Sequence, residues 1–204
     1  MIWPTSALDP LERLEERLLQ RLGEAVVKLV TPWVHARVAA AVARAVPRGA
    51  AVLVAQARPR GLARALARRL RGARIATDGL PLSPADCLPH PDASFDAAVA
   101  ALSAGDWDDE RARMHELFRV VRPGGFVFIC DRNSAVLPDR PPLSPFGSWR
   151  AGQPFGRREA GDLLADAGFM ELTFSQFLFR KFYLIRGRKP DLPDLPGFAA
   201  GRRD

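Results

Sequence analysis

The stretch VLVAQARPRG (52–61) joins an apolar run to a segment with helical spacing, a setting in which proteins often bind a phosphate or a nucleoside. A turn that passes close to such a ligand is typically rich in glycine, because glycine lets the backbone approach and adopts positive φ. Here the turn contains Gln56, Arg58 and Arg60 before Gly61. The segment therefore has the position of a ligand-binding turn but carries bulky and cationic side chains.

Positive charge is concentrated just after this turn. The chain of 204 residues has a formal net charge of +7 and a pI of about 10.6. No acid interrupts a run of seven arginines, which are Arg58, Arg60, Arg64, Arg68, Arg69, Arg71 and Arg74. Two interpretations stay open: an anion-binding face for RNA, an acidic membrane or an acidic protein, or a solvated helix face.

The cysteines and the apolar runs argue against a zinc protein, a disulfide-rich protein and a membrane-spanning protein. Cys87 and Cys130 are far apart and lack the spacing of metal ligands, so we expect no metal site and a reduced, cytoplasmic protein. No apolar run approaches the roughly 20 residues of a membrane span.

The first 48 residues have helical periodicity. Asp9 and Pro10 are a typical helix start. Leucine and valine then recur at three- and four-residue steps, at Leu11, Leu14, Leu18, Leu22, Val26 and Leu29. This stripe could pack on the domain, a partner helix or a membrane surface. We expect Pro32 to end the first helix and a second helix to cover 33–46.

Beyond residue 49, short apolar runs alternate with helical segments. The expected strands are 50–55, 73–77, 95–102, 124–131, 170–179 and 181–189, and the expected helices are 61–70, 108–121 and 157–169. This order predicts an α/β, doubly wound, mostly parallel sheet with an antiparallel C-terminal hairpin. We divide the chain into a helical arm (1–48), a domain (49–190) and a disordered tail (191–204), with a lid or partner-binding loop at 132–156.

Three motifs resemble one family. LPHPDASFD (88–96), RVVRPGG (119–125) and LLADAGF (163–169) are similar to segments of class I S-adenosylmethionine-dependent methyltransferases, especially the quinone-biosynthesis group. The resemblance implies a Rossmann-like fold and a site for S-adenosylmethionine. The residues themselves favour structural roles: Phe95 as a loop anchor, Asp96 at a strand entrance, and a tight turn at 123–125 with glycine at positive φ.

The chain departs from this family where the cofactor would bind. Aligned with the family's first strand, the acidic position holds Val54, and the glycine positions hold Gln56, Arg58 and Arg60. Their side chains would fill the space of the methionine part of the cofactor. Arginine would also repel the cationic sulfonium.

A second departure is one of length. Asp78 matches the acid that binds the ribose hydroxyls in the family, but only nine residues separate it from Leu88. A helix and a strand do not fit in that length, so we expect a sheet one strand shorter. The other positions that match the family site are Gly61, Asp86, Cys87 and Ser103.

No residue stands out as catalytic. Where close relatives carry a histidine pair, this chain has Gly105 and Asp106, and we expect His115 to be a surface residue.

Three hypotheses follow. The first is a pseudoenzyme with a degraded site and no cofactor, acting as a binding or accessory subunit through its N-terminal amphipathic helix or the 132–156 loop. The second is an active methyltransferase that uses S-adenosylmethionine on a small molecule, with Asp78 and Asp86 in the site. The third is a nucleic-acid-binding module built on the arginine-rich helix, although aromatic residues are not interleaved with its arginines.

Overall fold

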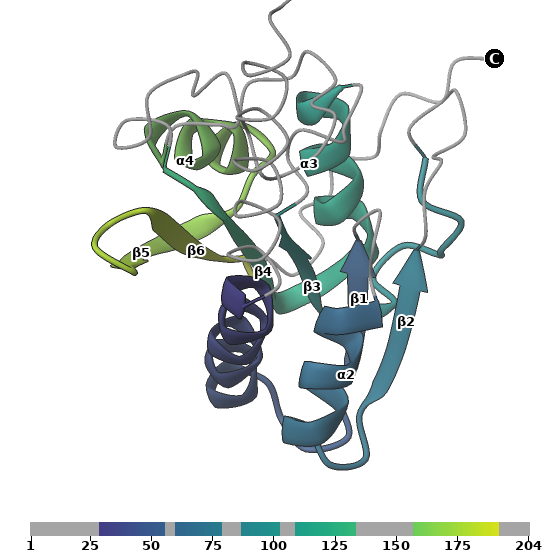
Figure 1. Cartoon of the computed structure of the whole chain (residues 1–204). Coiled ribbons are helices and arrows are strands. Elements are labelled where there is room, and N and C mark those ends of the chain that lie inside the picture. Colours follow the sequence, from purple (N-terminus) through teal and green to yellow (C-terminus); the bar gives the residue numbers. More distant parts are fainter. Residues whose placement is uncertain (1–28, 56–59, 79–86, 103–108, 134–156, 192–204) are drawn as a thin grey trace, which may run out of the picture.

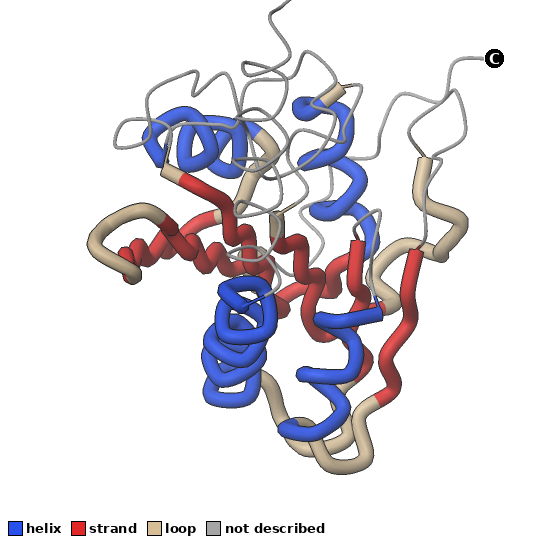
Figure 2. Tube along the Cα trace, viewed as in Figure 1, coloured by secondary structure: helices blue, strands red, loops and turns tan. Residues whose placement is uncertain are grey.

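The computed structural model describes residues 29–55, 60–78, 87–102, 109–133 and 157–191. Within these ranges the chain forms one six-stranded sheet with helices on both faces (Figure 1, Figure 2). The alternation of apolar strands and amphipathic helices therefore gives the α/β fold that the sequence predicted.

The strands lie in the order β2-β1-β3-β4-β6-β5. Their bounds are β1 (Ala51–Ala55), β2 (Arg74–Asp78), β3 (Phe95–Ala101), β4 (Val121–Arg132), β5 (Met170–Phe177) and β6 (Phe182–Arg188). The first four are parallel, and β6 pairs antiparallel with both β4 and β5. Among the described residues β2 has one neighbour, which agrees with the expected shortening of the sheet.

Two helical layers bury the two faces of the sheet (Figure 1). The helices are the N-terminal helix (29–45), α2 (Arg60–Arg69), α3 (Glu110–Val120) and α4 (Arg157–Asp166). Val52 and Val54 pack in the cluster that contains the N-terminal helix and α2, whereas Leu53 belongs to the cluster of α3 and α4. Every residue of β1 and β3 is buried, as expected for parallel strands covered on both faces.

The predicted helix break at Pro32 is wrong. The N-terminal helix covers 29–45 without interruption and contains Pro32 in its first described turn. The packing of the helix's apolar face on the sheet outweighs the local helix-breaking tendency of the proline. Val34, Val38 and Val42 hold this helix against the sheet.

Strand β4 begins three residues earlier than predicted. Val121 pairs with Phe95 of β3, and the register shifts before Ala97 pairs with Phe126. The strand therefore includes the turn motif at 123–125 as an irregularity. Gly124 has φ of +73°, which confirms the predicted need for glycine there.

Candidate functional site

The candidate site lies at the carboxyl ends of the parallel strands. The chain runs from β1 outward to β2 and then returns to β3 on the other side of β1. In open α/β sheets, ligands bind in the crevice where the strand order reverses in this way. The first strand, the start of α2 and the end of β2 therefore define the place to look for a ligand.

The structure brings several of the predicted site residues to this edge. Asp78 is the last residue of β2, and its backbone pairs with Ala55 at the end of β1. Arg60 is the first residue of α2 and is exposed, and Gly61 follows it. Cys87 is an exposed free thiol. The predicted positions Gln56, Arg58, Asp86 and Ser103 lie outside the described residues, as do Gly105 and Asp106.

Gly61 packs against the N-terminal helix. A Cβ atom added to Gly61 would lie 2.8 Å from both Cε1 and Nδ1 of His35. His35 is buried, and this burial lowers the pKa of its imidazole. The glycine thus allows a neutral histidine ring to approach the first turn of α2, a contact that the sequence did not indicate.

The first turn of α2 has a positive character. It contains no acidic residue, and Arg60 and Arg64 lie in its first two turns. The free N–H groups of a helix N-terminus add further positive potential. All five residues of β1 are apolar, so the described part of this strand supplies no carboxylate to offset that potential.

A buried polar group lies at the carboxyl end of β4. Asp131 of β4 pairs in register with Tyr183 of β6, and both are buried. Burial and the nearby Asp131 carboxylate raise the pKa of Tyr183, so its phenol remains protonated. Its hydroxyl is buried and has no hydrogen-bond partner among the residues that the structure describes. Sequence reasoning missed these residues, although an acid at the end of the apolar run FVFIC was a usable signal.

Arg113 and Asn133 are two further buried polar residues. Arg113 in the first turn of α3 has no exposed side-chain surface. Asn133 follows β4, and its Nδ2 donates to the carbonyl of Arg180 at 3.1 Å. The carboxyl end of β4 is therefore tied to the β5–β6 turn.

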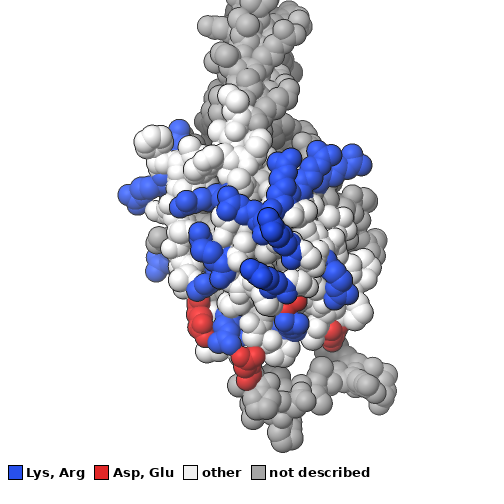
Figure 3. Space-filling view, turned by 90° about the horizontal axis from the view of Figure 1, so that it is seen from below, with Lys and Arg blue, Asp and Glu red and all other residues white. Residues whose placement is uncertain are grey.

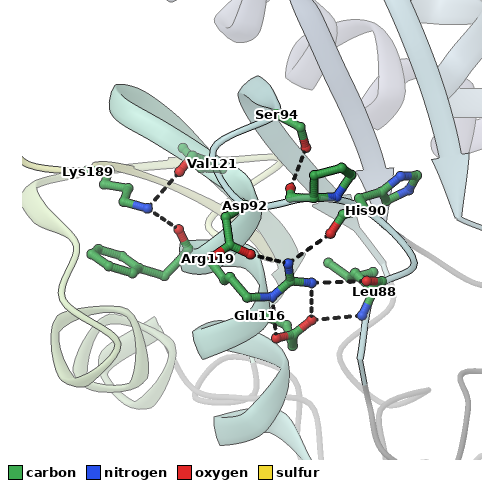
Figure 4. Close-up of polar contacts among 10 residues, drawn as sticks. Leu88, His90, Asp92, Ser94, Glu116, Arg119, Val121 and Lys189 are labelled. Atoms are coloured by element: carbon green, nitrogen blue, oxygen red, sulfur yellow. Dashed lines mark hydrogen bonds and ion pairs between the residues drawn. The ribbon is translucent and has the colours of Figure 1, made fainter. Parts of the chain in front are cut away.

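Two of the family-like motifs, 88–96 and 119–125, meet in a network of hydrogen bonds centred on Arg119, which we call the clamp (Figure 4). Arg119 donates to the carbonyls of Leu88 and His90 at 3.0 and 2.8 Å, and to the carboxylates of Asp92 and Glu116. This arrangement fastens the loop 88–94 to α3.

Asp96 and Lys189 complete that clamp. The Asp96 carboxylate accepts from the Ala51 N–H at 2.7 Å and pairs with Arg122. The Lys189 ammonium donates to the carbonyls of Phe118 and Val121 (Figure 4). Phe95 is buried, so the structural roles expected of these motifs are confirmed.

His115 lies apart from both groups. Its ring is half exposed and approaches the Asp166 carboxylate at 3.8 Å, which agrees with the expected surface role. Within the described ranges, no three His, Cys, Asp or Glu side chains are grouped as a metal site would require.

The helical layer of the N-terminal helix and α2 forms a strongly basic surface. The sequence contains no acid from residue 29 to residue 77. The exposed arginines on this layer and its connections are Arg37, Arg44, Arg48, Arg60, Arg64, Arg68, Arg69, Arg71 and Arg74. Figure 3 shows that cationic side chains far outnumber acidic ones on the side seen from below. A groove of about 410 Å³ on this layer is lined by Arg48, Arg69 and Arg71 with apolar neighbours.

No described helix is both long enough and apolar enough to cross a membrane.

Comparison with known proteins finds a family and a fold. A family model described as a methyltransferase domain matches residues 35–129. A demethylmenaquinone methyltransferase from Corynebacterium kroppenstedtii is 36% identical over 64 residues, which is 31% of this chain and 25% of that protein. The O-methyltransferase resE from Aspergillus sclerotiorum is 36% identical over 90 residues, 43% of this chain and 34% of that protein. The matched segments thus span a quarter to a third of these curated relatives.

Solved structures share the architecture at low sequence identity. An S-adenosylmethionine-dependent methyltransferase from Thermotoga maritima has a TM-score of 0.55 at 22% identity, covering 81% of this chain and 97% of its own. Phosphoethanolamine N-methyltransferase 2 from Haemonchus contortus, in complex with S-adenosyl-L-methionine, has a TM-score of 0.61 at 13% identity, covering 76% and 52%. At these identities the likeness shows the fold alone.

Proposed function

The chain belongs to the class I S-adenosylmethionine-dependent methyltransferase family, and from this premise we propose that it has lost tight binding of the cofactor. In this proposal it acts as a non-catalytic binding or accessory subunit. The observation that carries it is the segment from the end of β1 to the first turn of α2. The sequence there replaces the family's acid and glycines, and the remaining glycine, Gly61, packs on His35.

Steric and electrostatic effects both weaken the site. At the family's glycine positions the sequence has Gln56, Arg58 and Arg60, and side chains at those positions would compete with the cofactor's methionine part for space. The positive start of α2 opposes a cationic sulfonium. Each lost hydrogen bond to a charged ligand group costs roughly 1.5–3 kcal/mol, about tenfold or more in affinity. Two or three such losses take a micromolar site to the millimolar range.

We infer that the fold can persist without the cofactor. Arg119, Asp96 and Lys189 connect the loop 88–94, β1 and the chain after β6 through protein groups only. A chain can therefore keep this architecture after the ligand site has changed, which supports a binding role for the folded domain.

Isothermal titration calorimetry with S-adenosylhomocysteine, and separately with S-adenosylmethionine, tests the proposal. We expect dissociation constants in about the millimolar range or weaker, because the losses above accumulate. Asp78→Ala is the informative variant, since Asp78 matches the sequence position of the family's ribose-binding acid. A micromolar constant that Asp78→Ala abolishes would overturn the proposal.

That outcome would favour an active methyltransferase instead. Asp78 lies at the carboxyl end of β2 beside Ala55, where the family's ribose-binding acid would be. The buried pair Asp131 and Tyr183 supplies polar groups at the end of β4, on the same edge of the sheet. The names of the curated relatives make small molecules of the quinone type, or with a hydroxyl group, the first methyl acceptors to assay.

A further inference from the structure

Three large apolar side chains are exposed on two adjoining elements. Leu29 and Trp33 of the N-terminal helix are 78% and 47% exposed, and Phe179 in the β5–β6 turn is 90% exposed. The elements meet where the Trp33 ring packs on Phe177, with ring centroids 5.5 Å apart. Leu29 also belongs to the leucine stripe that the sequence identified.

The backbone of the β5–β6 turn makes Phe179 unusual. The N–H of Lys181 donates to the carbonyl of Leu178 at 3.0 Å, so Phe179 and Arg180 are the two central residues of a tight turn. Their φ values are +52° and +66°. Hairpin turns with positive φ at both positions strongly favour Asn-Gly, because larger side chains are strained there. An exposed phenylalanine at such a position gains no packing that would offset this cost.

Cations surround these apolar groups. Arg37 lies one helical turn after Trp33 on the same side of the helix, and Arg180 and Lys181 adjoin Phe179. All three are exposed. The sequence has no acid in 29–45 or in 177–183, so this surface complements an anionic partner.

We propose that this apolar-basic patch, formed by Leu29, Trp33, Phe179, Arg37, Arg180 and Lys181, docks on the surface of an anionic lipid bilayer. Leucine and aromatic side chains flanked by arginine and lysine are typical of segments that lie in the bilayer interface. Each lysine or arginine near an anionic membrane surface strengthens the attraction to it. A nucleic acid is a less suitable partner, because cations recognise its phosphate backbone and an exposed leucine adds nothing to that recognition.

The position of the patch sets how the docked protein would be oriented on the bilayer. Asn133 at the end of β4 binds the backbone of both Arg180 and Lys181, so the patch lies at the carboxyl edge of β4. Docking would place this edge of the sheet toward the bilayer. The inference does not rest on the proposed loss of the cofactor.

Co-sedimentation of the full chain with vesicles tests the docking. The vesicles contain either phosphatidylcholine with phosphatidylglycerol or phosphatidylcholine alone. We expect binding to the anionic vesicles that weakens with added salt, because the cationic attraction is screened. The decisive variant is F179N/R180G, which removes Phe179 and one cation but supplies the residues that the turn favours.

F179N/R180G should bind anionic vesicles at least about tenfold more weakly than the parent chain. The same variant should unfold at a higher temperature than the parent chain. Leu29→Ser should also weaken binding. Met170→Ser is the matched control, since Met170 is 60% exposed on β5 and outside the patch. Failure of the parent chain to sediment with anionic vesicles, or equal loss in Met170→Ser, would overturn the proposal. A dimer in solution that Leu29→Ser dissociates, without vesicle binding, would overturn it in favour of a second copy.

Discussion

Arg119 has contacts on three sides at once. Its Nε donates to one Glu116 oxygen at 2.8 Å and its Nη2 to the other at 2.7 Å, while Nη1 bonds Asp92 at 2.6 Å. Glu116 in turn accepts from the Leu88 N–H at 2.8 Å. The hydrogen bond from Arg119 holds the pKa of Glu116 below its usual range. The planar fork of a guanidinium makes this set of contacts possible, and an ammonium does not have that geometry.

Replacing Arg119 should therefore cost stability. Arg119→Ala is expected to lower the free energy of unfolding by about 2 kcal/mol, because two carbonyls and a carboxylate in a partly buried network lose their donor. Arg119→Lys should recover only part of the loss. Urea unfolding measures the effect. The control is Arg111→Ala, whose ion pair with Asp166 is 66% and 42% exposed and should contribute about 0.5 kcal/mol or less. Equal losses in the two alanine variants would contradict the structural role of Arg119.

At the scale of elements, the N-terminal helix and α2 meet where the flat ring of His35 packs on Gly61. Gly61 has no Cβ, so the His35 ring lies directly against the first turn of α2. The same helix buries Val34 and Val38 on the sheet. The first turn of α2 thus packs against a helix that carries none of the three family-like motifs.

This packing predicts a pH dependence of stability. Burial lowers the pKa of His35 in the folded chain from the ordinary 6.5, so the unfolded chain binds the proton more readily. The free energy of unfolding should therefore fall as pH decreases below 6.5 and continue to fall until the folded pKa is passed. Urea titrations across this range should show a smaller decrease for His35→Gln than for the parent chain.

His115→Gln is the control for that experiment, because the His115 ring is half exposed. A decrease in stability that is the same in the parent chain and in His35→Gln would show that His35 is not the responsible group.

At the scale of the whole molecule, the sheet has a protected centre and an open edge. Strand β3 is buried along its entire length between β1 and β4. Strand β2 has one partner among the described strands, and its described side chains are exposed or half-buried. The shortening of the fold thus leaves an edge beside the candidate site.

Hydrogen exchange should reveal this difference. Amides of β2 should exchange at least about tenfold faster than those of β3, because edge strands open with a smaller free energy than the core. Mass spectrometry of peptides from the two strands measures it. Protection of β2 equal to that of β3 would mean that another segment covers the edge.

The order of the elements was predictable from the sequence alone, because each strand and helix carries its own periodicity. The buried runs 51–55, 95–101 and 126–131 gave the parallel strands, and the nine residues before Leu88 predicted the shortened sheet. The need for positive φ at Gly124 was also local, since a tight turn specifies its residue types. The sequence alone also showed Gln56, Arg58 and Arg60 at the family's glycine positions.

Only the tertiary structure decided which elements meet. The contact of His35 with Gly61 joins the N-terminal helix to α2, and the pairing of Asp131 with Tyr183 joins strands 52 residues apart. Exposure of Trp33 and Phe179 is likewise a property of the packed molecule. Periodicity records how much of each element is buried, but the partner that buries it is set by the packing of the whole chain.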